Sequence, residues 1–406
     1  MDSALWKTNV RILWSGRFLV STGLTGISPF IPFFMESLSD GDTENRLLWS
    51  GLALAAPALS YAIMTPLWGK VSDRWSRKWM VVRALSGLAL SMFFMGIAQT
   101  PFQFFLFRLC QGAFGGISDA SSAFIGAETP KNRQGYTLGK MENASALGLL
   151  LGPFLGGILV EFWGCRPLLL LMGLLTGCCA IIAAIFLTET RSQTKAESIH
   201  NSIWKTFASL YQHRAVRAFI LAGILVKVAD FATFAIFTPY VEQMIQSSAT
   251  AIWAGILLAM TSFGELVGAP WWGKKNDCQR IEYTFIWAAF FCSVCMLIQT
   301  YTLSLQWLLI VRFLQGFSYS ALLQSVMLYV LRTSDMDNQG VRIGATNSLL
   351  MIGQITGPFL GSFLGSHIGF PFVFLVMGIV LAFTSMIIWY SSLLSSNRNL
   401  NVHHKL

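Results

Sequence analysis

Long apolar stretches alternate with short polar segments along all 406 residues of the chain. A helix needs about 20 mostly apolar residues to cross a bilayer. Twelve stretches meet this length, and their centres lie near Thr22, Leu59, Leu90, Leu109, Leu150, Gly177, Ala229, Ile256, Ala288, Tyr319, Gln354 and Ile379. Runs such as LLLLMGLLTGCCAIIAAIFL are apolar on every face, whereas a membrane barrel strand alternates apolar and polar residues. The pattern predicts an all-α integral membrane protein with twelve transmembrane helices.

Composition excludes a soluble protein. Hydrophobic residues make up 54% of the chain and charged residues 12%, which is about half the charged share of a soluble domain. Too few charges remain to cover the surface of a water-soluble fold of this size. The seven cysteines form no disulfide framework, and Cys292 and Cys295 lie inside an apolar stretch, so we expect no metal or cofactor.

The net charge of +9 follows from topology. With the N-terminus inside, 21 of the 28 basic residues fall in cytoplasmic segments and two fall in outer loops. An excess of Lys and Arg on the cytoplasmic side is the usual orientation signal. We therefore expect an inner (plasma) membrane protein with both termini in the cytoplasm, and no binding of nucleic acid.

The chain also contains an internal duplication. GPFLG occurs at Gly152–Gly156 and Gly357–Gly361, and RLCQG at Arg108–Gly112 is echoed by RFLQG at Arg312–Gly316. PLWGKVSD at Pro66–Asp73 likewise matches PWWGKKND at Pro270–Asp277. These matches keep one order and a nearly constant spacing. They predict two pseudo-symmetric six-helix halves, residues 1–189 and 218–406, joined by a cytoplasmic linker at residues 190–217.

Several of these motifs resemble those of the major facilitator superfamily. GKVSDRWSRK, between the second and third spans, resembles its G-x-x-x-D-R-x-x-R-K loop, with Ser76 in place of a common glycine. GLLLGPFLGG at Gly148–Gly157 resembles the antiporter motif G-x-x-x-G-P-x-x-G-G at every fixed position. With RLCQG and SPFIPFF, the chain is most similar to the twelve-helix drug:proton antiporters. The resemblance covers essentially the whole chain and implies a transporter.

The loop between the second and third spans is a candidate cytoplasmic gate. An acid there is not needed for topology, but it can receive the positive N-terminal end of a neighbouring helix. Basic residues of the same loop can pair with acids across the halves and latch the cytoplasmic side. The candidate gate residues are Gly69, Asp73, Arg74, Arg77 and Lys78, with Asp277 as the weaker counterpart in the second half.

The two GPFLG copies predict a hinge and seal on the fifth and eleventh spans. Proline frees backbone groups inside a helix, but neighbouring helices can satisfy those groups in lipid. Glycines let such helices approach closely. The residues expected to do this are Gly148, Gly152, Pro153, Gly156, Gly157, Gly357 and Pro358.

Ionisable residues at membrane depth are candidates for proton coupling, because burying them is costly. Lys227 and Asp230 lie three residues apart and therefore on one helix face. Such a pair can hold a proton or exchange it for a cationic substrate. A permanent ion pair that neutralises itself is the equal alternative. Glu265, on the eighth span, is either a proton carrier or an anchor of the cytoplasmic gate.

The fourth span carries a second candidate pair. Arg108 and Asp119 are eleven residues apart, close to three helical turns, so a continuous helix would place them on one stripe with Gly112. By resemblance, Arg108 belongs to the proton-coupling apparatus; the alternative is a structural tether to carbonyls of the first span. Asp119 could instead be simply solvated. Arg312, the repeat counterpart of Arg108, has both readings open.

Aromatic and Met side chains could line a substrate cavity by stacking and cation–π contact. The candidates are Tyr61, Phe234, Tyr319 and Met351, with Arg312 among them. Such residues also serve as ordinary packing or face lipid.

The sequence contains no phosphate-binding loop, no H-E-x-x-H pattern and no nucleophile–base set, so we expect no enzymatic activity and an ion gradient as the driving force. The first hypothesis is proton-driven export of amphipathic toxic compounds by alternating access. The alternative is export of a dedicated metabolite such as a siderophore, and a non-transporting scaffold or sensor is a third class. Partners would be a small-molecule substrate, protons and the bilayer, with the protein acting as a monomer.

Overall fold

A computed structural model of the chain describes residues 5–38, 43–72, 76–130, 133–189, 213–245, 249–301, 304–333 and 339–403. These ranges are almost entirely helical and contain no β-strand. Every one of the twelve predicted span centres lies in a helix. Within the described ranges, ten helices are long and apolar enough to cross a membrane. The predicted all-α class is therefore confirmed.

The chain packs as two compact units, which are described separately. The first comprises Met1–Glu197 together with Phe237–Ala259, and the second comprises Ser198–Ile236 together with Met260–Leu406. The first unit therefore contains, besides the first helices of the chain, a segment taken from α10 and α11.

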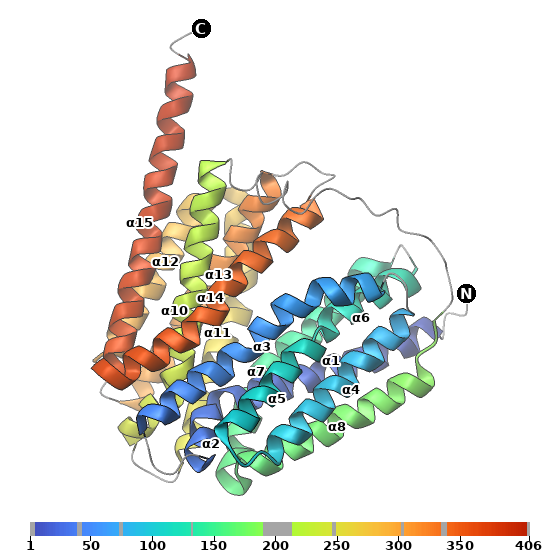
Figure 1. Cartoon of the computed structure of the whole chain (residues 1–406). Coiled ribbons are helices and arrows are strands. Elements are labelled where there is room, and N and C mark those ends of the chain that lie inside the picture. The colour runs from blue at the N-terminus through green and yellow to red at the C-terminus, as the bar shows by residue number, and fades with distance from the viewer. Residues whose placement is uncertain are drawn as a thin grey trace. The chain divides into compact units, whose positions relative to one another are not determined.

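In the first unit the helices pair in a regular way (Figure 1). Helix α1 packs against α7, α3 packs against α5, and α4 packs against α8. The buried core between α1, α4, α6, α7 and α8 includes Leu13, Val81, Phe124, Met141 and Ala183. The elements are α1 (Leu5–Ile27), η1 (Ser28–Phe30), α2 (Ile31–Leu38), α3 (Thr43–Ser72), α4 (Arg77–Gly96), α5 (Pro101–Phe114), α6 (Ile117–Glu128), α7 (Gln134–Trp163) and α8 (Cys165–Phe186).

Two predicted spans consist of more than one helix. The first span is interrupted by the short 3₁₀ turn η1, which contains Pro29; proline cannot donate the backbone bond that a regular helix needs there. The fourth span is interrupted between α5 and α6, where Gly116 adopts φ +94°. That left-handed conformation suits glycine and ends the preceding helix.

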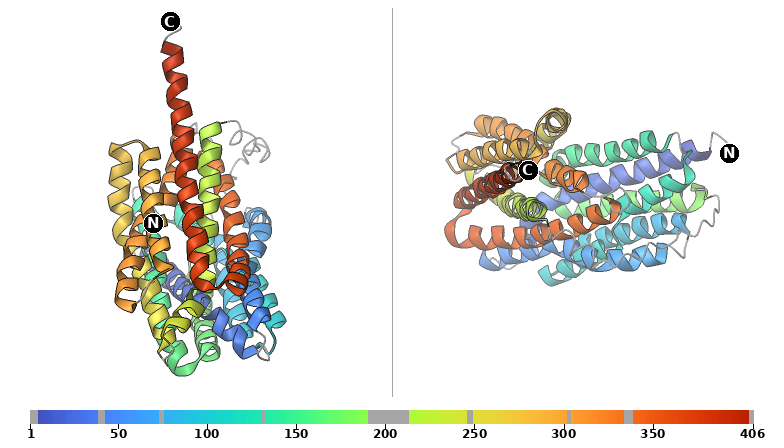
Figure 2. Two further views of the ribbon diagram at one scale, coloured as in Figure 1. Left: turned by 90° about the vertical axis from the view of Figure 1, so that its left-hand side faces the viewer. Right: turned by 90° about the horizontal axis from the view of Figure 1, so that it is seen from above.

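The second unit contains the first part of α10 (Arg214–Ile245), the last part of α11 (Thr250–Cys278) and four whole helices. The whole helices are α12 (Ile281–Gln299), α13 (Leu305–Arg332), α14 (Gln339–Ile368) and α15 (Phe370–His403). Helix α12 packs against both α13 and α15. Helix α15 is one uninterrupted helix of 34 residues. The left view in Figure 2 shows it lengthwise, coloured red.

The duplication is visible in equivalent contacts of the two units. Trp68 Nε1 donates to the carbonyl of Ala113 at 2.7 Å, and Trp272 Nε1 donates to the carbonyl of Phe317 at 2.8 Å. A Cβ on Gly112 would lie 2.1 Å from Pro57 O, and one on Gly316 would lie 1.9 Å from Thr261 O. In each unit, therefore, the same contacts join the second helix of the repeat to the fourth.

Candidate functional site

One carboxylate of the second unit, that of Asp230 on α10, is bound by a neighbouring helix. The hydroxyl of Tyr319, on α13, donates to Asp230 Oδ2 at 2.9 Å. Tyr319 is buried, with 8% of its surface exposed, and Asp230 is half-buried. Asp230 also interacts electrostatically with Lys227, Arg312 and Glu265. Helices α10, α11 and α13 thus bring four predicted site residues around one carboxylate.

Lys227 lies one turn before Asp230 but does not close an ion pair with it. Its ammonium lies over the ring of Phe231, 5.2 Å from the centroid. Within the described residues, the hydrogen-bond partner of the Asp230 carboxylate is the neutral hydroxyl of Tyr319. The alternative of a closed, self-neutralising pair is not the arrangement in this structure.

Glu265, on α11, is half-buried. Its carboxylate makes no hydrogen bond or ion pair with the described residues, although it interacts electrostatically with Asp230 and Lys227. Glu265 and Asp230, on α11 and α10, therefore lie close enough for their charges to interact.

Arg108, on α5, is 4% exposed and is held from two directions. Its Nε donates to the carbonyl of Ala53 at 2.9 Å, and its Nη1 donates to Gln111 Oε1 at 2.6 Å. The carbonyl belongs to α3, the second span, whereas the tethering alternative expected the first span. Both contacts satisfy a buried guanidinium.

Arg312 occupies the equivalent place on α13. It is 4% exposed, donates from Nη1 to Gln315 Oε1 at 3.4 Å, and lies 5.6 Å from the ring centroid of Phe374. Gln315 also accepts from Gln299 Nε2 at 2.8 Å. The Arg–Gln pairing is thus repeated in both units, as the duplication predicts.

The prediction that Arg108 and Asp119 share one stripe of a continuous helix is wrong. The break at Gly115–Gly116 separates them, so that Arg108 is buried in α5 while Asp119 is exposed in the first turn of α6. Asp119 Oδ2 instead accepts a short hydrogen bond from the hydroxyl of Tyr61, on α3. Arg83, on α4, is close by: its Nη2 donates to the carbonyl of Gly115 and its guanidinium stacks 3.7 Å from the Trp68 ring centroid.

The candidate gate is only partly described. Asp73 and Arg74 lie outside the described residues, and Gly69 lies within α3. The backbone N–H groups of Arg77 and Lys78 donate to the carboxylate of Glu189 at 3.0 and 3.2 Å, and the Ser76 hydroxyl donates to the same group. Glu189 therefore caps the N-terminus of α4, which explains a hydroxyl residue at position 76.

In the second unit, Asp277 pairs with Arg332 at the end of α13. Arg332 Nη2 lies 3.3 Å from Asp277 Oδ1, and both side chains are substantially exposed. The same nitrogen donates to the carbonyl of Asn276. Asp277, the predicted gate acid of the second half, thus ties α11 to α13 within its own unit.

The glycines of the predicted hinge mark very close helix contacts. A Cβ on Gly152 would lie 2.8 Å from Thr22 O, and one on Gly156 would lie 2.2 Å from Gly26 O. Gly157 and Pro153 face Gly255 of α11 at similarly short range. Helix α7 continues through Pro153 as one element. Gly148 lies on the same α1-facing side of the helix.

The second GPFLG copy packs in the same manner. Cβ atoms on Gly357 and Gly361 would lie 2.8 Å from Val228 O and 2.1 Å from Ala232 O, both on α10. Helix α14 continues through Pro358. Ser362 stands where the first copy has Gly157; it is fully buried, and its hydroxyl has no hydrogen-bond partner among the described residues.

The remaining cavity candidates are half-buried. The ring of Phe234, on α10, lies 6.4 Å from that of Phe231, and Met351 lies on α14. Tyr61 belongs to the first unit, where its partner is Asp119.

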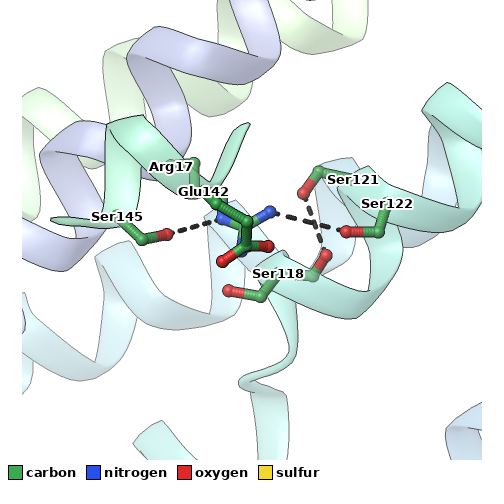
Figure 3. Close-up of polar contacts among 6 residues, drawn as sticks. All are labelled: Arg17, Ser118, Ser121, Ser122, Glu142 and Ser145. Atoms are coloured by element: carbon green, nitrogen blue, oxygen red, sulfur yellow. Dashed lines mark hydrogen bonds and ion pairs between the residues drawn. The ribbon is translucent and has the colours of Figure 1, made fainter. Parts of the chain in front are cut away.

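Sequence reasoning missed one charged cluster in the first unit (Figure 3). Arg17 on α1 forms an ion pair with Glu142 on α7, 2.7 Å between Nη2 and Oε1, and Ser122 and Ser145 also contact its guanidinium. The signal was the position of Ser145, three residues before Gly148 on the α1-facing side of α7.

Apolar helices with ionisable side chains packed inside them are typical of a multi-pass membrane protein with a functional site inside the membrane. A sequence profile of the Major Facilitator Superfamily matches residues 13–278 and, in an overlapping second match, residues 224–402. The chain belongs to the Major Facilitator Superfamily, and the predicted twelve-helix architecture of two halves is confirmed.

Two kinds of relative match nearly the full length of the chain. The Staphyloferrin B transporter of Staphylococcus aureus (strain NCTC 8325 / PS 47) is 36% identical over 97% of this chain and 95% of its own length. The Multidrug resistance protein MdtG of Proteus mirabilis (strain HI4320) is 31% identical over 95% of this chain and 96% of its own length. Both are named as transport or resistance proteins, so the predicted transporter class is confirmed.

Solved structures support the fold. A bacterial homolog of the human lysosomal transporter Spinster, inward-facing and unoccupied, superimposes with a TM-score of 0.83 over 97% of this chain and 98% of that one. The nucleoside transporter NupG superimposes with a TM-score of 0.74 over 96% of this chain and 99% of that one. Both are 14% identical to this chain, so the likeness concerns the fold alone.

Proposed function

We propose that the chain is a proton-coupled exporter of small molecules. The observation that carries this proposal is the Asp230 carboxylate, which is half-buried and hydrogen-bonded to a neutral tyrosine while Lys227 points elsewhere. A carboxylate that is not locked in an ion pair is free to take up and release a proton. Glu265 and Lys227 stand close enough to sense that change.

In the proposed cycle, proton and substrate compete for the same charged groups. Protonation of Asp230 or Glu265 from outside favours return of the empty carrier, and release of the proton inside permits loading of substrate. Arg108 and Asp119 complete the coupling residues in the first half. Tyr61, Phe234, Tyr319, Arg312 and Met351 are the proposed substrate contacts. The two halves expose these residues to each side in turn, as in other secondary transporters with repeated halves.

The proposed substrates are amphipathic toxic compounds, including drugs. The support is the match to proteins named Multidrug resistance protein MdtG, which extends over almost the whole chain. Half-buried acids next to aromatic rings also suit lipophilic cations.

Export of a dedicated metabolite, such as a siderophore, is the second candidate. It is favoured by the 36% identity to the Staphyloferrin B transporter. Buried Arg17, Arg108 and Arg312 would suit an anionic metabolite better than a cation.

The remaining expectations belong to the same proposal. We place the protein in the inner membrane with both termini in the cytoplasm, working as a monomer without catalytic activity. The halves are residues 1–189 and 218–406. Gly69, Asp73, Arg74, Arg77, Lys78 and Asp277 are assigned to the cytoplasmic gate, and the glycines and prolines of both GPFLG copies to the hinge.

Substrate-driven proton movement in liposomes tests the proposal. Purified protein with a pH-sensitive dye inside the vesicles is challenged with a panel of lipophilic dyes, antibiotics and siderophores. We expect proton flux with at least one compound, and its loss in Asp230→Asn. Proton flux with no compound of the panel overturns the coupling, and full flux in both Asp230→Asn and Asp119→Asn overturns the site assignment.

A further inference from the structure

Arg17, a buried arginine of the first unit, forms an ion pair with a largely exposed glutamate. The side chain of Arg17 is 5% exposed, whereas that of Glu142, its ion-pair partner, is 70% exposed. Ser145 accepts from Arg17 Nε at 2.6 Å and belongs, like Glu142, to α7. Ser122, on α6, accepts from Nη1 at 3.4 Å. Figure 3 shows the guanidinium between α6 and α7 with these serines on either side.

The three contacts differ in strength. The bond from Nε to Ser145 is short and fixes the plane of the guanidinium, whereas a 3.4 Å contact is weak. Glu142 uses one oxygen on one nitrogen, although the Nη1–Nη2 edge of an arginine can bind both oxygens of a carboxylate. The Nη1–Nη2 edge of Arg17 therefore binds a carboxylate through only one of its two nitrogens.

Glu142 is also weakly held. An ion pair with a largely exposed partner contributes little, because water competes for the exposed group. A second carboxylate that engages both Nη1 and Nη2 would make one more charge-assisted bond than Glu142 makes. Exchange of Glu142 for such a group is therefore favoured by geometry.

Two glycines one turn from members of the cluster lie on open helix surface. Gly139, one turn before Glu142 on α7, and Gly126, one turn after Ser122 on α6, would each carry a Cβ without meeting any atom within 4 Å. An ionised carboxylate facing hydrocarbon is costly, so the exposed side of Glu142 faces water. A solute can therefore approach the pair.

The pair is not part of the helix packing that both units share. A Cβ on Gly152 would lie 2.8 Å from Thr22 O, and one on Gly357 would lie 2.8 Å from Val228 O, which aligns α1 with α10 at a spacing of 206 residues. At this spacing Gly223 is the repeat counterpart of Arg17. The spacing of 205 residues between α7 and α14 makes Asn347 the repeat counterpart of Glu142. The second unit packs in the same way without the charges.

We propose that Arg17 binds a carboxylate group of the transported compound, with Glu142 as its exchangeable counter-ion. This inference rests on the proposed transport function and names a chemical class for one part of the substrate. Arg17 supplies the bidentate edge, Ser145 holds its plane, and Glu142 moves into water when the substrate carboxylate arrives. No proton is consumed in that exchange.

The test is a binding titration by calorimetry on the full-length protein in lipid nanodiscs. The probes are citrate, tetraphenylphosphonium and inorganic phosphate. We expect Glu142→Gln to bind citrate several-fold more tightly, because the competing carboxylate is gone, and Arg17→Gln to bind it about tenfold more weakly. Arg11→Gln removes an exposed arginine of the same helix and is the matched control, with citrate affinity within about twofold of the wild type.

The sign of the Glu142→Gln effect decides the question. A structural ion pair predicts weaker or unchanged citrate binding in that variant, and either result overturns the proposal. So does citrate binding that survives in Arg17→Gln, or tetraphenylphosphonium binding that falls in parallel with citrate. Binding of phosphate without citrate overturns the carboxylate assignment.

If Arg17→Gln does not yield folded protein, the Glu142→Gln titration alone carries the result. The proposed function is tested separately by proton flux in liposomes. Flux without the Glu142→Gln effect refutes the carboxylate site alone, whereas tighter citrate binding without flux for any compound refutes the coupling alone.

Discussion

The hydroxyl of Tyr319 donates a 2.9 Å hydrogen bond to Asp230, joining α13 to α10 in the second unit. This bond gives the carboxylate a neutral partner, and Lys227, one turn away, is left directed at the ring of Phe231. The proposed coupling depends on that arrangement.

Removing the donor and removing the acid should therefore have different effects. In Tyr319→Phe a hydrogen bond worth about 1 kcal/mol is lost, so we expect transport to slow by about fivefold with protons per substrate unchanged. In Asp230→Asn, substrate-driven proton release should disappear. Both quantities come from flux measurements in liposomes. Unchanged proton release in Asp230→Asn moves the coupling role to another acid.

The cap that Glu189 provides should be measurable as stability. Its carboxylate accepts from the first N–H groups of α4 and from Ser76. We expect Glu189→Ala to cost about 1 kcal/mol and to lower the apparent melting temperature in detergent, measured by tryptophan fluorescence. Ser76→Gly, which removes one of the three contacts, should lower it less. Equal melting temperatures for Glu189→Ala and the wild type would show that the cap is not formed in the membrane protein.

The glycine contacts predict a contrast between two alanine substitutions on one helix. In Gly156→Ala the new methyl would meet Gly26 O at 2.2 Å, so α1 and α7 must separate, at a cost of about 1–3 kcal/mol. In Gly139→Ala the methyl meets nothing within 4 Å, and removing a helical glycine there should stabilise by up to about 1 kcal/mol. Melting temperatures of both variants check this. A destabilised Gly139→Ala together with a neutral Gly156→Ala contradicts the packing.

Arg108 can be assigned by separating its two roles. Arg108→Lys keeps the charge but cannot reproduce the bonds to both Ala53 and Gln111. We expect coupled transport to fall at least about tenfold, and Gln111→Ala, which leaves the bond to Ala53, to fall less. Normal proton coupling with a lowered melting temperature in Arg108→Lys identifies the residue as a tether.

Sequence reasoning was reliable where one strong local signal decides the structure. Apolar length located all twelve spans, and the repeated motifs predicted the duplication. The structure then shows equivalent contacts of Trp68 and Trp272, and an Arg–Gln bond in each unit, because both copies of a duplicated segment must satisfy the same backbone geometry.

It failed where the outcome depends on distant partners. The break at Gly115–Gly116 was read as a continuous helix, because adjacent glycines are tolerated inside membrane helices. The Glu189 cap joins α4 to the residues after α8, which no local pattern reports. The ion pair between Arg17 and Glu142, 125 residues apart, was missed, since the place of Glu142 on α7 has meaning only once α1 is packed against it.

The shared helix packing of the two units has an evolutionary consequence. Trp68 and Trp272, and the glycines of both GPFLG copies, maintain the framework through contacts to backbone carbonyls that both units share. Gly223 and Asn347 are the repeat counterparts of Arg17 and Glu142. Leu24 is the repeat counterpart of Asp230. Under the proposed assignments, mutations can therefore alter recognition in one repeat without disturbing proton coupling in the other. A lineage built on this duplication would then acquire new cargo by few substitutions while retaining its driving force.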